Sequence, residues 1–109
     1  AYKDFIKLHA QKQMKGQQLY TGPTVVKVLF SMPIPKSWSK KKQQEAISTV
    51  HIKKPDIDNL VKGVFDALNK TAWHDDNQVF MVIGAKVYGK EPGIEVQIMG
   101  LAEWENLSA

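Results

Sequence analysis

The chain has 109 residues, the size of one small domain, and its hydrophobic content of 43% excludes a disordered chain. It has no cysteine, which excludes disulfides, thiolate-bound metals and catalysis by a cysteine nucleophile. The formal charge is +4, and all 15 basic residues are lysines. Lysine binds phosphate as a point charge, so this composition favours contact with a phosphate backbone over bidentate reading of bases.

No apolar run approaches the roughly 20 residues that a membrane-spanning helix needs, and no signal peptide opens the chain. We therefore expect a cytoplasmic protein. The chain starts at Ala1 without an initiator methionine, already in a helical pattern. The start of the native protein is therefore expected to be missing.

The N-terminal third predicts a helix and then a strand. Residues 1–15 place apolar side chains at helical spacing, and Gly16 is the expected stop. From Thr24 to Met32, valines and other apolar residues alternate in the pattern of a strand with one buried face and one partly covered face. Pro33 follows and ends the strand.

Two further helices are predicted in the middle of the chain. Ser37 or Ser39 is expected to cap a short, polar helix that ends near Ser48. The next helix should begin at or just after Asp56, because Pro55 disfavours helical structure in the residue before it. Its apolar stripe is Ile57, Leu60, Val61, Val64, Phe65 and Leu68.

The C-terminal part predicts two strands, Val79 to Val87 and Ile94 to Met99, separated by a turn with two glycines and a proline. We expect these strands to pair as a hairpin. The tail from Gly100 onward has no clear pattern. Together the elements predict an α+β fold with a small mixed sheet flanked by helices.

Two pairs of aspartates surround the third helix: Asp56 and Asp58 at its start, Asp75 and Asp76 beyond its end. Each has an ordinary structural explanation. Asp56 suits a helix N-cap, Asp58 suits the first turn, and Asp75 and Asp76 suit a turn. A helix of about 14 residues is ~20 Å long, so spacing alone does not bring the two pairs together.

If the pairs meet, their chemistry is coherent. Mg²⁺ prefers hard oxygen ligands, and such an ion activates water and stabilises a leaving oxygen in phosphodiester hydrolysis. Lys62, one turn after Asp58, would offset charge on the phosphate. Lys53 and Lys54 would bind flanking phosphates.

Other kinds of site fit poorly. DIDN fails as an EF-hand, because its sixth position is Val61 and its twelfth is Ala67. His74 has no second histidine at ligand spacing for zinc. There is no glycine-rich phosphate loop and no serine nucleophile motif. Trp73 is interpreted as a core or lid residue.

Two segments, PDIDNLVKGVFDAL and AWHDDNQV, resemble the RusA family of Holliday junction resolvases in order and spacing. The family pattern is D-x-D-N-L-x-K-x-x-x-D-A-L followed by W-x-D-D-x-Q-V. The resemblance implies a small homodimeric, Mg²⁺-dependent endonuclease, bacterial or prophage-encoded, in which Mn²⁺ substitutes for Mg²⁺. It would nick opposing strands of four-way or branched DNA in recombination and repair, leaving 5′-phosphates.

Carried over residue by residue, the resemblance implies that Asp56, Asp58 and Asp76 bind metal, with Asp75 assisting or shaping the turn. It implies that Asp76 returns to the helix start and that Lys62 is the catalytic lysine. Asp66 is expected to orient Lys62. The lysines expected to bind DNA are Lys40, Lys41, Lys42, Lys53 and Lys54.

This chain departs from the family pattern in two ways. Family members usually begin with a strand and a basic loop, which the single domain of residues 1–109 lacks, and they often carry arginines. Two alternatives remain open: a catalytically inactive phage relative that binds branched DNA or regulates, and a structural domain whose acids are caps and turn residues. Measurements of metal binding and of DNA binding would distinguish these two alternatives from the nuclease.

Overall fold

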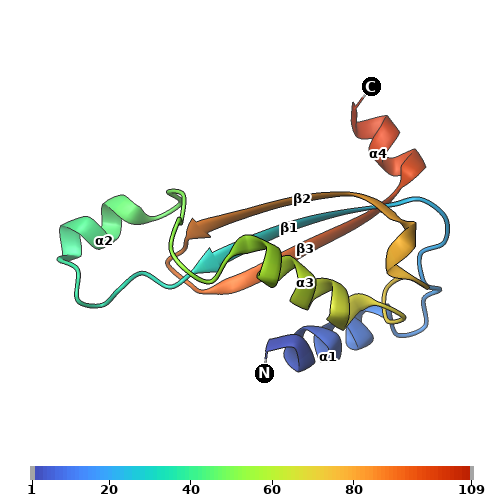
Figure 1. Ribbon diagram of the computed structural model, residues 1–109, viewed down its shortest axis with the longest axis horizontal. Coiled ribbons are helices and arrows are strands. Elements are labelled where there is room, and N and C mark those ends of the chain that lie inside the picture. Colours follow the sequence, from blue (N-terminus) through green and yellow to red (C-terminus); the bar gives the residue numbers. More distant parts are fainter. Residues whose placement is uncertain (1, 109) are drawn as a thin grey trace.

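The computed structural model describes residues 2–108, which form a small mixed sheet with helices (Figure 1). In chain order the elements are α1 (Tyr2–Met14), β1 (Thr24–Met32), α2 (Lys40–Ala46), α3 (Ile57–Leu68), the 3-10 helix η1 (Asp76–Gln78), β2 (Val79–Tyr88), β3 (Gly93–Gly100) and α4 (Leu101–Ser108). The α+β class is confirmed. The predicted limits of β1 agree with the structure.

The sheet is centred on β1, in the order β2-β1-β3. β1 runs parallel to β2 and antiparallel to β3. β1 is apolar on both faces, which fits its central place. Its buried residues include Val25, Val26, Val28 and Phe30, whereas the residues of the two outer strands are largely exposed. A strand with apolar residues on both faces is stable only when neighbours cover it.

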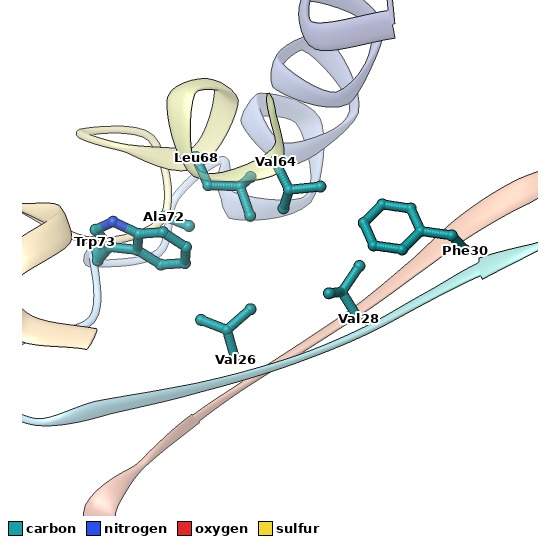
Figure 2. Packing of buried hydrophobic residues seen from close by; sticks show 7 residues of the cluster. All are labelled: Val26, Val28, Phe30, Val64, Leu68, Ala72 and Trp73. Carbon is teal, nitrogen blue, oxygen red and sulfur yellow. The ribbon is translucent and has the colours of Figure 1, made fainter. Parts of the chain in front are cut away.

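The core lies between β1 and α3. Figure 2 shows Val26, Val28 and Phe30 of β1 directed toward Val64 and Leu68 of α3. Trp73 closes one end of this cluster and is fully buried, which confirms it as a core residue. The apolar stripe of α3 thus fixes which face of the helix meets the sheet, and leaves the opposite face in solvent.

The expected hairpin between the last two strands is wrong. β2 and β3 are antiparallel to each other in direction, but β1 lies between them. Their connection crosses the end of β1, where the N–H of Gly89 donates to the Met32 carbonyl at 3.0 Å. A Cβ on Gly89 would lie 2.7 Å from Ser31 Cβ, so this close crossing requires glycine. Turn residues predicted the reversal but not the strand inserted inside it.

The other helices, α1, α2 and α4, differ in how they contact the sheet and α3. α1 packs against α3 and ends where Gly16 adopts a φ of +77°, as predicted. α2 is capped by Ser39, whose Oγ accepts from the N–H of Lys42 at 3.2 Å. The tail beyond Gly100 forms α4, which packs against β3 and β1.

Among the residues that the structure describes, no helix has the length and apolar character required to cross a membrane.

Candidate functional site

Asp56 and Asp58 both lie exposed at the start of α3. Asp56 occupies the N-cap position, and its backbone carbonyl accepts from the N–H of Leu60 at 3.2 Å. Its side chain makes no capping hydrogen bond. The ordinary explanation for this aspartate therefore accounts for its backbone position only, and its carboxylate is available to a ligand.

The loop that leads into α3 is held by Lys86 from the end of β2. Lys86 Nζ donates to the carbonyl of Lys53 at 2.6 Å and to that of Pro55 at 2.7 Å. The Lys54–Pro55 peptide bond between these carbonyls is cis. Because Asp56 follows Pro55 directly, the ammonium group fixes the backbone from which the first carboxylate projects.

Lys62 lies exposed on α3, one turn after Asp58. Residues four apart on a helix are surface neighbours, so the two side chains share one face. Asp66 does not take the expected role of orienting Lys62. Its Oδ2 forms an ion pair at 3.1 Å with Lys3 of α1, between two half-exposed side chains.

Asp75 and Asp76 have different environments. Asp75 caps η1, and its Oδ1 accepts from the N–H of Asn77 at 2.9 Å. Gln78 completes this capping box, since its Oε1 accepts from the N–H groups of His74 and Asp75 at 2.9 and 3.1 Å. Of the two roles left open for Asp75, this geometry favours shaping the turn.

Asp76 is held by the core. Its Oδ1 accepts from the indole Nε1–H of Trp73 at 2.8 Å. The indole is fully buried, whereas Asp76 is half-buried. The buried indole thus holds one carboxylate oxygen of Asp76. Among the hydrogen bonds of this turn within residues 2–108, none involves the other oxygen.

The structure does not bring the two acidic pairs together within one chain. α3 begins near the end of β2, whereas η1 leads into the start of β2 (Figure 1), so Asp56 and Asp76 lie toward opposite ends of β2. A helix of 12 residues is ~18 Å long. In residues 2–108 no group of three or more carboxylates or imidazoles is placed to hold a metal ion. The expected return of Asp76 to the helix start is therefore not seen in the single chain.

The predicted DNA-binding lysines lie at the same end as Asp56 and Asp58. Lys40, Lys41 and Lys42 are exposed on α2, which projects from that end (Figure 1), and Lys53 and Lys54 are exposed in the following loop. Lys42 Nζ also lies 4.1 Å from the centre of the Trp38 ring. In this cation–π contact the ammonium group lies over the ring, and Lys42 stays exposed.

His51 holds the same loop against β2 through its contact with Tyr88. Its ring packs edge-on against Tyr88 at 4.8 Å, and Tyr88 contacts Trp38 at 5.5 Å. Its Nδ1 is buried and has no hydrogen-bond partner among the described residues. Burial lowers the pKa of His51, and the nearby charges of Lys86 and Lys53 lower it further. Both effects favour the neutral imidazole in the folded protein.

Sequence reasoning missed two residues that position the aspartates. Gln78 could have been found, since the spacing from Asp75 matches a capping box. Its Nε2 donates to the carbonyls of Tyr20 and Gly22 at 2.8 and 3.1 Å, which joins η1 to the loop before β1. Lys86 gave no signal beyond a lysine in an apolar strand, because its partners are backbone carbonyls distant in sequence.

The arrangement provides two exposed carboxylates and a lysine in basic surroundings, with a third anchored carboxylate elsewhere. Mg²⁺ takes one or two protein carboxylates and completes its shell with water and substrate phosphate. Asp56 and Asp58 have the donor chemistry for part of that shell. A set of three carboxylate ligands does not form among the described residues of one chain.

The chain is similar to a known protein family and to a bacterial protein. The family model described as endodeoxyribonuclease RusA matches residues 1–99. The uncharacterized protein YqaN of Bacillus subtilis (strain 168) is 41% identical over 101 residues, covering 89% of this chain and 70% of that relative. The family match over residues 1–99 includes β1, α3, η1 and β2, and so every residue described in this site.

Proposed function

The chain belongs to the RusA family of endodeoxyribonucleases, and we propose that it resolves Holliday junctions by paired nicking of branched DNA during recombination and repair. Hydrolysis of the phosphodiester would use water as the nucleophile and leave 5′-phosphate ends. The observation that carries the proposal is the pair of exposed carboxylates, Asp56 and Asp58, with the exposed Lys62 one turn after Asp58.

The positions of these residues support a catalytic role. The Asp56 carboxylate makes no capping bond, although its position would allow one. A free N-cap carboxylate forgoes about 0.5–2 kcal/mol of helix stabilisation, which suits a group kept for a ligand. Lys62 supplies a positive charge on the same helical face, where charge develops on the phosphate.

We propose Mg²⁺ as the cofactor, with Mn²⁺ able to replace it. Asp56 and Asp58 are the residues of this part of the chain that would hold the ion. When bound, such an ion supplies activation of water and neutralisation of the leaving oxygen.

Lys53, Lys54 and the lysines of α2 are proposed to bind the DNA backbone on either side of the cleaved bond. They are exposed and lie at the same end of the molecule as the start of α3. The absence of arginine from the chain favours recognition of shape and phosphate over recognition of bases.

The test is cleavage of a labelled four-way junction with Mg²⁺, compared with a linear duplex of the same sequence. Asp58→Asn is expected to lower the cleavage rate at least about 100-fold and to retain junction binding. Glu105→Gln makes the same chemical change on the exposed face of α4 and is expected to cleave normally. Equal cleavage by both variants would remove Asp58 from the proposed site.

A second candidate function is branched-DNA binding or regulation without cleavage. It is favoured by one observation, that no set of three carboxylates forms within residues 2–108. This alternative predicts salt-dependent junction binding, together with no heat of Mn²⁺ binding in calorimetry. Mn²⁺ binding that disappears in Asp58→Asn would decide for the nuclease.

A further inference from the structure

The segment between α2 and Asp56 presents two apolar side chains to solvent. Val50 is 73% exposed and Ile52 is 85% exposed, the highest values for large apolar residues within residues 2–108. Single exposed apolar residues are common on protein surfaces. Here two of them flank one buried residue, His51, and polar residues precede and follow them in the sequence.

The backbone that carries both side chains is fixed to the end of β2. Val50 forms an antiparallel bridge with this strand. The N–H of His51 donates to the carbonyl of Lys86 at 3.1 Å, and the His51 ring packs edge-on against Tyr88. Because side chains alternate along an extended backbone, Val50 and Ile52 point away from the face that His51 buries. Ordered structure therefore holds these two side chains in solvent.

The surrounding charge indicates the kind of partner. Residues 36–54, the basic segment, contain six lysines and one glutamate, a formal charge of +5, since 6 − 1 = 5. The whole chain carries +4, so the other residues together carry −1, since 4 − 5 = −1. All six lysines are exposed. Such a concentration of positive charge favours a polyanion such as DNA over a neutral protein surface.

We propose that Val50 and Ile52 form an apolar wedge that enters DNA between bases at the branch point, and that this wedge selects branched DNA over linear duplex. The inference rests on the proposed function. It deepens that function by assigning the residues that recognise the branch.

The chemistry of the two partners supports a contact with bases. Aliphatic side chains gain little from phosphates, which the lysines bind, but they gain from the apolar faces of bases. In a continuous duplex these faces are stacked, and an inserted side chain must overcome the unstacking energy. At a branch point the strands change partners and the stack opens more easily. The wedge therefore favours the junction, whereas the lysines contact junction and duplex alike.

The wedge also lies close to the proposed catalytic residues. Four residues of extended chain span at most ~14 Å, so the backbone of Ile52 lies within that distance of the backbone of Asp56. Bases along one strand are ~3.4 Å apart, so this distance corresponds to about four of them. A wedge at the branch point thus places the cleaved bond within a few nucleotides of the branch.

The test measures binding by fluorescence anisotropy without divalent metal, on a four-way junction and on a linear duplex of the same sequence. Val50→Gln combined with Ile52→Gln is expected to lower junction affinity at least about 10-fold, as for the lost burial of one aliphatic side chain. Duplex affinity should be unchanged. The slope of log K against log salt should also stay the same, because every lysine is kept. A double variant with the wild-type preference for the junction would overturn the wedge and assign the patch to a protein partner.

Two further variants control for general effects. Phe5→Gln combined with Leu107→Gln removes two apolar side chains of similar exposure, 63% and 68%, on α1 and α4. This variant should bind as the wild type does, and an equal loss of preference in it would overturn the wedge. Val50→Ile combined with Ile52→Leu keeps aliphatic side chains and should retain the preference.

Base unstacking gives a direct readout. A fluorescent adenine analogue placed beside the branch point should become brighter when the wild-type protein binds, and should not when the double glutamine variant binds. Equal fluorescence in the two complexes would overturn the wedge. Selective binding with this rise in fluorescence, but without cleavage when Mg²⁺ is added, would overturn the proposed nuclease and leave the wedge established.

Discussion

The buried indole of Trp73 donates a 2.8 Å hydrogen bond to Asp76 Oδ1, which ties a predicted metal ligand to the centre of the core. The two residues are three positions apart in the sequence, so the bond is set by the local turn. The indole is held in place, because the Trp73 ring also packs edge-on against the Phe65 ring, with 5.4 Å between the ring centres. The carboxylate is therefore oriented before any ligand arrives.

The first prediction concerns this bond. Trp73→Phe keeps an aromatic ring but removes the donor, so Asp76 loses its fixed orientation. We expect junction cleavage to fall about 10-fold or more, as for other partners of metal ligands. Stability should fall by about 1–3 kcal/mol through the smaller ring and the lost bond.

The control is Phe65→Leu, which perturbs the same aromatic contact and leaves the hydrogen bond intact. It should lower the urea midpoint while the cleavage rate per folded molecule stays near wild type. Equal loss of rate in both variants would show that packing, and not the hydrogen bond, sets the position of Asp76.

The second prediction concerns Lys86. Lys86→Met retains the aliphatic stem but removes both hydrogen bonds to the loop before Asp56. A mobile loop would misplace the carboxylate, and we expect kcat to fall about 10-fold or more with a smaller change in KM. Lys86→Arg should recover part of the rate, since it restores donors to the two carbonyls.

Lys90→Met provides the matched control. Lys90 is exposed in the turn after β2, and its substitution removes the same charge. It should leave kcat unchanged. If Lys86→Met raised KM alone, Lys86 would be a DNA contact and not a positioning residue.

The third prediction separates the lysines of α2 from general charge. Changing Lys40, Lys41 and Lys42 to glutamine lowers the formal charge from +4 to +1, since 4 − 3 = 1. If each contacts one phosphate, the slope of log K against log salt should become shallower by about 2.7. Fluorescence anisotropy with a labelled junction at several salt concentrations measures this slope.

The same loss of charge in and directly after α1, through Lys7, Lys12 and Lys15 changed to glutamine, should alter the slope much less. All three are exposed, so neither triple variant disturbs the core. A similar change in both would mean that net charge, and not the position of α2, determines the affinity.

The fourth prediction follows from His51. Its pKa is lowered in the folded protein by burial and then by Lys86 and Lys53. The unfolded chain, with a histidine pKa of about 6.5, therefore binds a proton before the folded chain does. Stability should be constant well above pH 6.5 and should fall as pH decreases through that value, until the lower folded pKa is reached.

Urea unfolding at several pH values between about 8 and 5.5 measures this loss. His51→Phe keeps the ring against Tyr88 but cannot be protonated, so its stability should depend less on pH in this range. The exposed His74→Gln variant should keep the wild-type dependence. An unchanged dependence in His51→Phe would assign the loss to other groups.

The sequence predicted those features that depend on local pattern. The alternation from Thr24 to Met32 defined β1, and the stripe from Ile57 to Leu68 defined the buried face of α3. Ser39 and Gly16 acted as cap and stop because their effects are confined to one turn. The segments PDIDNLVKGVFDAL and AWHDDNQV also indicated the family, since the residue spacing within each segment is itself local.

Features that depend on distant pairing were not predictable in this way. The turn after Tyr88 indicated a reversal, but nothing near it shows that β1 would lie between the two strands. Similarly, the spacing of Asp58 and Asp76 leaves their separation open, because it depends on where η1 joins the sheet. The contacts of Gln78 and Lys86 are to backbone carbonyls, which carry no residue-specific signal.

The insertion of β1 between β2 and β3 has a consequence for folding kinetics. In the parallel ladder Thr24 is paired with Val79, 79 − 24 = 55 residues later in the chain. The turn at Gly89 cannot nucleate the sheet by itself, because the two strands it joins share no ladder. Closing such a long loop before any sheet hydrogen bonds form is slow. α3 lies between β1 and β2 in the sequence and packs against β1 through Val64 and Leu68, so we expect its formation to shorten the loop that must close before these two strands pair.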